Sequence, residues 1–134
     1  MLLIPVVAIA LCLAALFAFA TFNNNLEEKS NELSELTGNL VFNENYIKAQ
    51  AKLIWNESLE NCSTCDETQL KKKFIEITKE KESLFRYLPA ENFYGKVFRG
   101  EFNITANSLL IEDVFTEKKI GNNKIKRTFA IILN

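Results

Sequence analysis

Hydrophobic positions change their spacing along the chain, and each spacing predicts a different element. Residues 1–22 are almost entirely Leu, Ile, Val, Ala and Phe, and no charged side chain precedes Glu27. A helix over this segment has no polar stripe, so apolar matter has to surround it on every side. At 1.5 Å per residue it is about 33 Å long, which is enough to cross the hydrocarbon of a bilayer.

The helical spacing continues beyond the apolar segment. Leucines recur near helical spacing at Leu26, Leu33, Leu36 and Leu40. The first stop signal is Gly38-Asn39, so the pattern predicts an N-terminal helix over residues 1–37. Its first part, residues 1–22, is apolar all round and its second part is amphipathic. Residues 38–134 then form a globular, exported head.

Two further amphipathic helices are predicted in the head. In the first, over residues 43–59, the apolar positions have helical spacing and Asn43 or Asn45 would cap the N-terminus. The second lies between Asp66 and Leu88, with apolar residues on one side and charged residues facing water. Pro89 ends it, because a residue that precedes proline is biased out of the helical region.

From Phe93 onward the apolar spacing becomes 2, which predicts a strand that reaches Ile104. A second strand is expected over residues 109–115 and a third over 125–133, with Gly121-Asn122-Asn123 as the turn between them. Three successive strands favour an antiparallel meander with one face covered by the preceding helices. The predicted fold class is therefore α+β: a long hydrophobic N-terminal helix, two further helices and a C-terminal antiparallel β-meander.

Charge and composition narrow the classes of function. The chain has 16 basic and 17 acidic residues, and this balance argues against nucleic acid as the primary ligand. Its densest basic run, Lys71-Lys72-Lys73, is interpreted as a solvated helix face. The chain contains no His, which excludes imidazole catalysis and ordinary His-containing zinc sites.

The most tempting acid pair for catalysis is Glu112-Asp113. Neighbouring positions on a strand point to opposite faces, so we do not expect these carboxylates to form a paired site. The sequence also lacks a Gly-rich phosphate loop and a nucleophile elbow. We therefore expect no catalytic residues, no metal and no cofactor, and a protein that is not an enzyme.

The three cysteines have different settings. Cys12 lies inside the apolar segment, where it behaves as a small hydrophobe, and Cys62 and Cys65 form Cys-Ser-Thr-Cys. This pair is compatible with a local disulfide, free thiols, half of a metal site or a redox centre, and the leading interpretation is a disulfide in an exported head. Three glycosylation sequons, at Asn56, Asn61 and Asn103, also favour export.

The apolar segment fits three environments: lipid, the machinery that removes a signal peptide, or identical helices of neighbouring subunits. Ala18-Phe19-Ala20 would serve as a signal cleavage site, but no Lys or Arg precedes the apolar run. Membrane anchors usually have flanking Lys or Arg and interfacial Trp or Tyr, and none stands near Phe22. The missing flanks favour neighbouring subunits.

A helix that is apolar first and amphipathic afterwards, leading into a small α+β head, resembles a mature type IV pilin or pilin-like subunit. Archaeal pilins are the nearer comparison, since the composition rich in Asn, Lys, Glu and Ile and the sequons suit them. Bacterial pilins typically carry Glu as the fifth mature residue, whereas archaeal pilins commonly lack it and often have Pro near the mature start, as at Pro5 here. In that family a basic leader is removed by a prepilin peptidase. The uncharged start at Met1-Leu2-Leu3-Ile4 looks like such a processed end.

The resemblance implies a structural subunit of an extracellular type IV pilus-like filament on the cell surface, serving adhesion or cell contact. Its partners would be identical subunits in a helical homopolymer, and the membrane would hold the chain before assembly. The alternative is a single-pass membrane-anchored protein with an extracellular binding domain. The expected assembly core consists of Leu2, Leu3, Ile4, Val7, Ala10, Leu11, Leu13, Ala14, Phe17 and Ala18.

Overall fold

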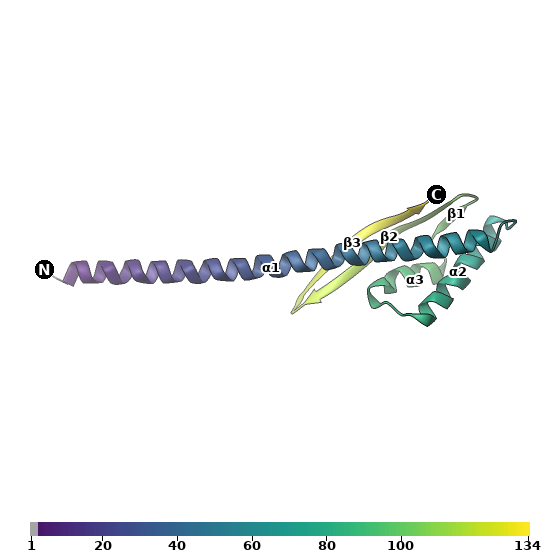
Figure 1. The fold of residues 1–134 in the computed structure, drawn as a ribbon. Helices are drawn as coiled ribbons and strands as arrows, with labels where there is room; N and C mark the ends of the chain where they lie inside the picture. The colour runs from purple at the N-terminus through teal and green to yellow at the C-terminus, as the bar shows by residue number, and fades with distance from the viewer. Residues whose placement is uncertain (1–2) are drawn as a thin grey trace. The chain divides into compact units, whose positions relative to one another are not determined.

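The computed structural model describes residues 3–134, with side chains from Pro5 onward. The chain divides into two units after Gly38. Helix α1 (Leu3–Glu60) provides the described residues of the first unit and the first element of the second (Figure 1). The second unit, called the head below, continues with α2 (Glu67–Leu84), a 3-10 turn η1 (Leu88–Ala90), α3 (Glu91–Arg99), β1 (Asn103–Thr105), β2 (Ser108–Ile120) and β3 (Asn123–Leu133).

The predicted fold class is confirmed, because the chain has a long N-terminal helix, two further helices and a three-stranded antiparallel sheet in the order β1-β2-β3. The assignment of the two further helices was partly wrong. The helix predicted over residues 43–59 is the last part of α1, and α3 is the second of the two. Gly38-Asn39 does not end α1.

Helix α1 continues through Gly38, which has no feature of a helix end other than being a glycine. Its φ is not positive, unlike that of Gly100 and Gly121, and the residues on both sides keep good helical spacing. A single right-handed glycine costs about 1 kcal/mol relative to alanine, which a long periodic helix tolerates.

Helix α2 begins with a capping box. The Asp66 carboxylate accepts a hydrogen bond from the Gln69 backbone N–H at 2.7 Å, and the Gln69 side chain accepts one from the Asp66 N–H at 3.1 Å. The helix ends at Leu84, earlier than the predicted end at Leu88. Residues 85–87 are not helical, and η1 begins at Leu88. Pro89 lies in the first turn of η1, where its missing N–H costs no hydrogen bond.

The strand predicted from Phe93 to Ile104 was wrong over most of its length. Residues 91–99 form α3, which buries Phe93, Tyr94 and Val97 on one face, and only residues 103–105 are extended. Alternation over this stretch was misleading because positions i, i+1 and i+4 form a helical stripe equally well. Gly100, with φ 72°, ends α3 in the left-handed conformation typical of a helix C-terminus.

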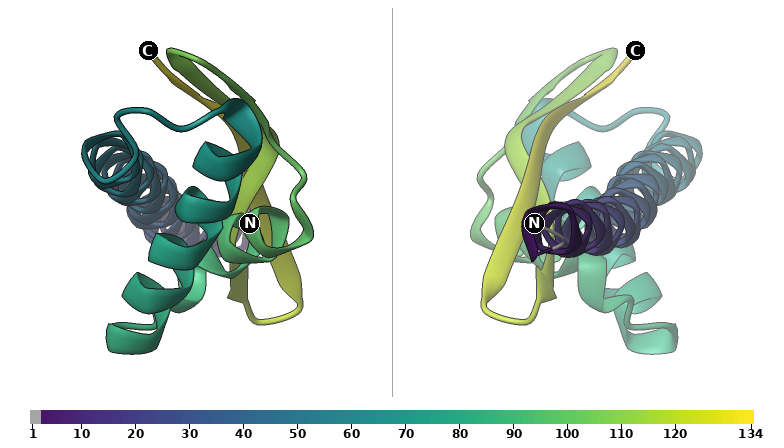
Figure 2. Two further views of the ribbon diagram at one scale, coloured as in Figure 1. Left: turned by 90° about the vertical axis from the view of Figure 1, so that its right-hand side faces the viewer. Right: turned by 90° about the vertical axis from the view of Figure 1, so that its left-hand side faces the viewer.

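Strands β2 and β3 form the long twisted hairpin drawn green to yellow in Figure 2. The predicted turn is confirmed: Ile120 pairs with Asn123, and Gly121 between them has φ 54°. A β-bulge lies between Ile111 and Val114, where Asp113 has φ 52°. Two residues of β2 there oppose one of β3, so the inward face resumes at Val114.

The head has one hydrophobic core. Helix α1 contributes Ile47 and Trp55, and α2 contributes Phe74, all of them at most 1% exposed. The Trp55 and Phe74 rings meet edge to face, with centroids 6.3 Å apart. The core also includes Ala51, Ile54, Leu70, Ile77, Phe93, Val97, Phe102, Leu109, Ile111, Val114 and Ile131.

Polar contacts fix the sheet of the head to α1. Glu44 is buried between Lys48, at 2.6 Å, and Arg127 of β3, and both cations donate to its carboxylate. These hydrogen bonds, first that from Lys48, hold the pKa of Glu44 below its usual 4.5, although burial opposes them. Nearby, Tyr87 donates to the Asn43 amide oxygen at 2.6 Å, and burial raises the pKa of this phenol.

Candidate functional site

The apolar segment of α1 is solvent-exposed over its whole described length. Every residue from Pro5 to Phe22 is exposed, and Phe17 reaches 77%. Large hydrophobic side chains stand on all sides of the helix at Val6, Val7, Ile9, Leu11, Leu13, Leu16, Phe17, Phe19 and Phe22. A contiguous apolar surface of this kind marks an interaction with a membrane or with another protein. By length and composition, the helix can also span a membrane.

The structure describes most of the expected assembly core. Leu2 lies outside the described residues, and Leu3 and Ile4 belong to α1 without described side chains. The other expected residues, which are Val7, Ala10, Leu11, Leu13, Ala14, Phe17 and Ala18, are all exposed on α1. Helical geometry places them on one side of the helix, because their spacing follows i, i+3, i+4 and i+7, with Leu13 at the margin.

Small residues form a narrow stripe within this side. Ala10, Ala14 and Ala18 follow one another at i, i+4 and i+8 on the exposed helix. Small residues at this spacing let two helix backbones approach closely, while larger neighbours such as Leu11 and Phe17 fill the adjacent grooves. The stripe would thus permit a close helix contact along this side of the segment.

The polar end of the segment is also helical. Thr21 donates its hydroxyl to the Phe17 carbonyl at 2.9 Å, which satisfies the hydroxyl within the helix itself. The Asn23-Asn24-Asn25 tract that follows is exposed and helical, and it does not interrupt α1. The change from apolar to charged surface thus occurs along a continuous helix.

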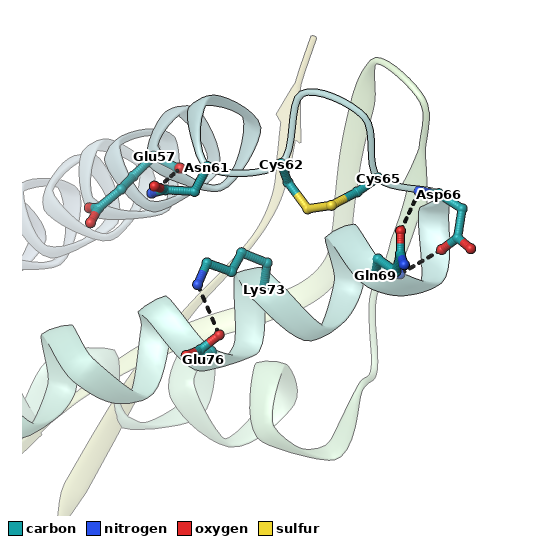
Figure 3. The surroundings of a disulfide bond; sticks show 8 residues. All are labelled: Glu57, Asn61, Cys62, Cys65, Asp66, Gln69, Lys73 and Glu76. Carbon is teal, nitrogen blue, oxygen red and sulfur yellow. Dashed lines mark hydrogen bonds and ion pairs between the residues drawn. A yellow bond between two sulfur atoms is a disulfide. The ribbon is translucent and has the colours of Figure 1, made fainter.

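Cys62 and Cys65 form a disulfide in the turn between α1 and α2, with Cα atoms 5.1 Å apart (Figure 3). The bridge lies directly before the Asp66 cap of α2, and both cysteines pack against the hydrophobic core. A second link between the two helices is the ion pair of Lys81 with Glu57, at 2.8 Å. In this position the disulfide fixes a helix–helix connection of the head. Cys12 is a free, exposed thiol on the apolar segment.

The three glycosylation sequons have different local structures. Asn56 lies within α1, and the Ser58 of its sequon is fully buried with its hydroxyl donated to the Ile54 carbonyl. Asn61 is exposed in the disulfide turn and Asn103 is exposed on β1, an edge strand. All three asparagine residues are exposed in the folded head, although the Ser58 of the first sequon is buried. Their occupancy remains a prediction.

The reasoning about the acid pair Glu112-Asp113 was wrong in its geometry. The β-bulge exposes both side chains, and they line one surface pocket with Lys71 and Lys96. Lys71 is also not the solvated side chain that was expected, because its ammonium donates to the Gly100 and Phe102 carbonyls at 2.9 and 3.1 Å. Those carbonyls follow the C-terminus of α3, where a cation is favourable.

Comparison with known proteins gives no relative: the chain matches no protein-family model, no curated protein and no solved structure.

Proposed function

We propose that this protein is a structural subunit of an extracellular type IV pilus-like filament, which polymerises through the apolar segment of α1 and serves adhesion or cell contact. The observation that carries the proposal is the exposure of apolar side chains on every side of residues 5–22, with a small-residue stripe at Ala10, Ala14 and Ala18. Identical subunits that repeat a head-to-tail contact form an open helical assembly.

The energetics support burial of this segment in a bundle. Burying one large apolar side chain is worth about 1.5–3 kcal/mol relative to leaving it in water. The nine large hydrophobic residues exposed between Val6 and Phe22 together favour removal from water by roughly 14–27 kcal/mol. Outside the membrane, identical helices packed around the segment would remove these side chains from water.

Lipid also removes these side chains from water, so in this proposal the segment lies in the membrane before assembly. What favours a filament over a permanent anchor is the composition of the flanks. The first basic residue after the segment is Lys29, and neither Trp nor Tyr occurs before Tyr46. A permanent anchor normally uses such residues to fix its depth in the bilayer.

The first experiment asks where the protein is found. Cells that make the full chain are sheared, and the released material is examined by electron microscopy and by mass spectrometry of the intact subunit. Fibres that contain this chain are the expected result. A chain found solely as a monomer in detergent-soluble membranes contradicts the proposal and supports the membrane-anchored alternative.

Ala14→Asp tests the role of the apolar segment directly. It places an unpaired carboxylate on the small-residue stripe, where close helix packing leaves no water, so fibre formation should be abolished. Asn24→Asp adds the same charge on the same helix beyond the apolar segment and should leave fibres intact. Normal fibres from Ala14→Asp would show that this stripe is not buried in an assembly.

A further inference from the structure

The tip of the β2–β3 hairpin carries a concentrated positive charge. We call residues 117–127 the basic hairpin. It has one acidic residue, Glu117, against five basic ones, which are Lys118, Lys119, Lys124, Lys126 and Arg127. These five side chains are all exposed. Two of the five have a carboxylate partner: Lys124 pairs with Glu117 at 2.8 Å, and Arg127 pairs with Glu44.

The register of the hairpin places like charges against each other. In the strand register, Lys119 lies directly opposite Lys124, and Glu117 lies directly opposite Lys126 on the same face of the hairpin. Directly opposed like charges destabilise an antiparallel pair. Among residues 5–134, no carboxylate lies within ion-pair distance of Lys118, Lys119 or Lys126. The hairpin therefore carries an unfavourable charge arrangement that an anionic partner would relieve.

The first unit of the chain carries a surface of the opposite sign. We call Glu28, Glu32 and Glu35 the acidic stripe, since their spacing of i, i+4 and i+7 places them on one side of α1. All three are exposed. Like charges at i, i+4 destabilise a helix, so this stripe also has an unfavourable arrangement on its own. None of the three has an ion pair among the residues whose side chains are described.

We propose that the basic hairpin of one subunit docks on the acidic stripe of a neighbouring copy of the same chain. This inference rests on the proposed function, because a filament brings the head of one subunit beside α1 of another. The occupant is a second copy because the chain itself supplies a surface of opposite sign, and each surface relieves the repulsion within the other. The contact adds to the apolar packing and fixes the register of neighbouring subunits.

The dimensions of the two surfaces agree. Along α1, Glu28 and Glu35 are separated by about 10 Å, at 1.5 Å per residue. On the hairpin, Lys124 and Lys126 are about 7 Å apart along the strand, and Lys119 lies about 5 Å across from Lys124. Flexible lysine stems cover the remaining difference. The ammonium groups of Lys119 and Lys126, which have no carboxylate partner among the described residues, can thus face carboxylates of the stripe at the same time.

Zero-length carbodiimide cross-linking tests the contact on the native chain, because it joins an amine to a carboxylate only when the two touch. Fibres grown from an equal mixture of ¹⁴N and ¹⁵N chains are cross-linked and digested, and the same reaction is run on the full chain in detergent micelles. About half of the peptides that join hairpin lysines to Glu28, Glu32 or Glu35 should carry mixed isotopes, as random pairing of neighbouring chains requires. Complete absence of mixed-isotope peptides places the contact within one chain and overturns the proposal, as does linkage of these lysines to other carboxylates.

A charge exchange separates this inference from the proposed function. Lys119→Glu with Lys126→Glu, which lie on the same face of the hairpin, should reduce fibre yield about tenfold, and adding Glu28→Lys with Glu32→Lys should restore it. The matched control, Lys52→Glu with Lys72→Glu, changes the same number of exposed charges on helices and should assemble normally. Unchanged fibres from the hairpin variant, or no restoration by the exchange, overturn the docking contact while the filament itself stands. Absence of fibres from the unaltered chain refutes the proposed function instead.

Discussion

Glu44→Gln should destabilise the head at neutral pH, because it removes one buried charge and keeps the shape of the side chain. The Glu44 side chain is 11% exposed, whereas its partners Lys48 and Arg127 are 42% and 44% exposed. A charge-assisted hydrogen bond contributes about 1.5–3 kcal/mol when buried, and solvent at the two cations lowers this value. We therefore expect a loss of about 1–2 kcal/mol in the free energy of unfolding.

The assay is urea unfolding of the full chain in non-ionic detergent, followed by the fluorescence of Trp55. This residue is the single tryptophan of the chain and is 1% exposed in the core of the head. With a urea dependence of about 2 kcal/mol per molar, the unfolding midpoint should fall by about 0.5–1 M. Glu117→Gln is the matched control, because it removes an exposed ion pair with Lys124 and should shift the midpoint very little.

The pH dependence distinguishes charge from packing. The folded pKa of Glu44 lies below 4.5, so its ionised form stabilises the head fully above about pH 4.5. This stabilisation is lost as the pH falls through the lower, folded pKa, where the carboxylate takes up a proton. The midpoints of the unaltered chain and Glu44→Gln should therefore converge as the pH falls below the folded pKa of Glu44. A midpoint difference that stays the same as the pH is lowered stepwise from about 7 into the acid range would refute the electrostatic argument.

Two further predictions concern the disulfide and the glycines. Cys62→Ser with Cys65→Ser, or reduction by dithiothreitol, should lower the free energy of unfolding by about 2 kcal/mol, as loop-closure entropy predicts for a separation of 3 residues; an unchanged Trp55 urea midpoint would contradict this. Gly100→Ala should destabilise the head by about 1 kcal/mol because φ is 72° there, whereas Gly38→Ala should raise helicity in circular dichroism because nothing lies within 4 Å of its Cβ position. Equal effects of the two glycine substitutions would contradict the assignment of Gly38 to a continuous helix.

The sequence predicted the parts of the fold whose pattern is strong and local. The apolar segment, the helix behind the Asp66 cap and the Gly121 turn are each specified by residues close together in the chain. Residues 93–99 were assigned to a strand because their apolar residues alternate. The same residues also fit a helical stripe, and they form α3 in the structure. Packing of Phe93 and Val97 into the core decides between the two, and this packing depends on distant residues.

The candidate sites also differ in whether nearby residues or the folded structure define them. The continuous apolar run of residues 1–22 is visible in the sequence alone, so the assembly residues could be proposed from it; their role in assembly stays a prediction. The basic hairpin was not recognised, because its significance depends on the register that opposes Lys119 to Lys124. The structural contacts of Lys71 and the exposure of both Glu112 and Asp113 were missed for a similar reason, since a helix C-terminus and a bulge had to be located first.

The bulge at Asp113 has a consequence for how such a protein can vary. A bulge bends its strand and increases the local twist, so a single extra residue sets the direction in which the hairpin leaves the rest of the head. Deleting Asp113 would restore regular alternation from Ile111 through Glu112 to Val114, and every inward side chain would stay inward. One in-frame codon thus separates two sequences that share the same core but point the β2–β3 hairpin in different directions.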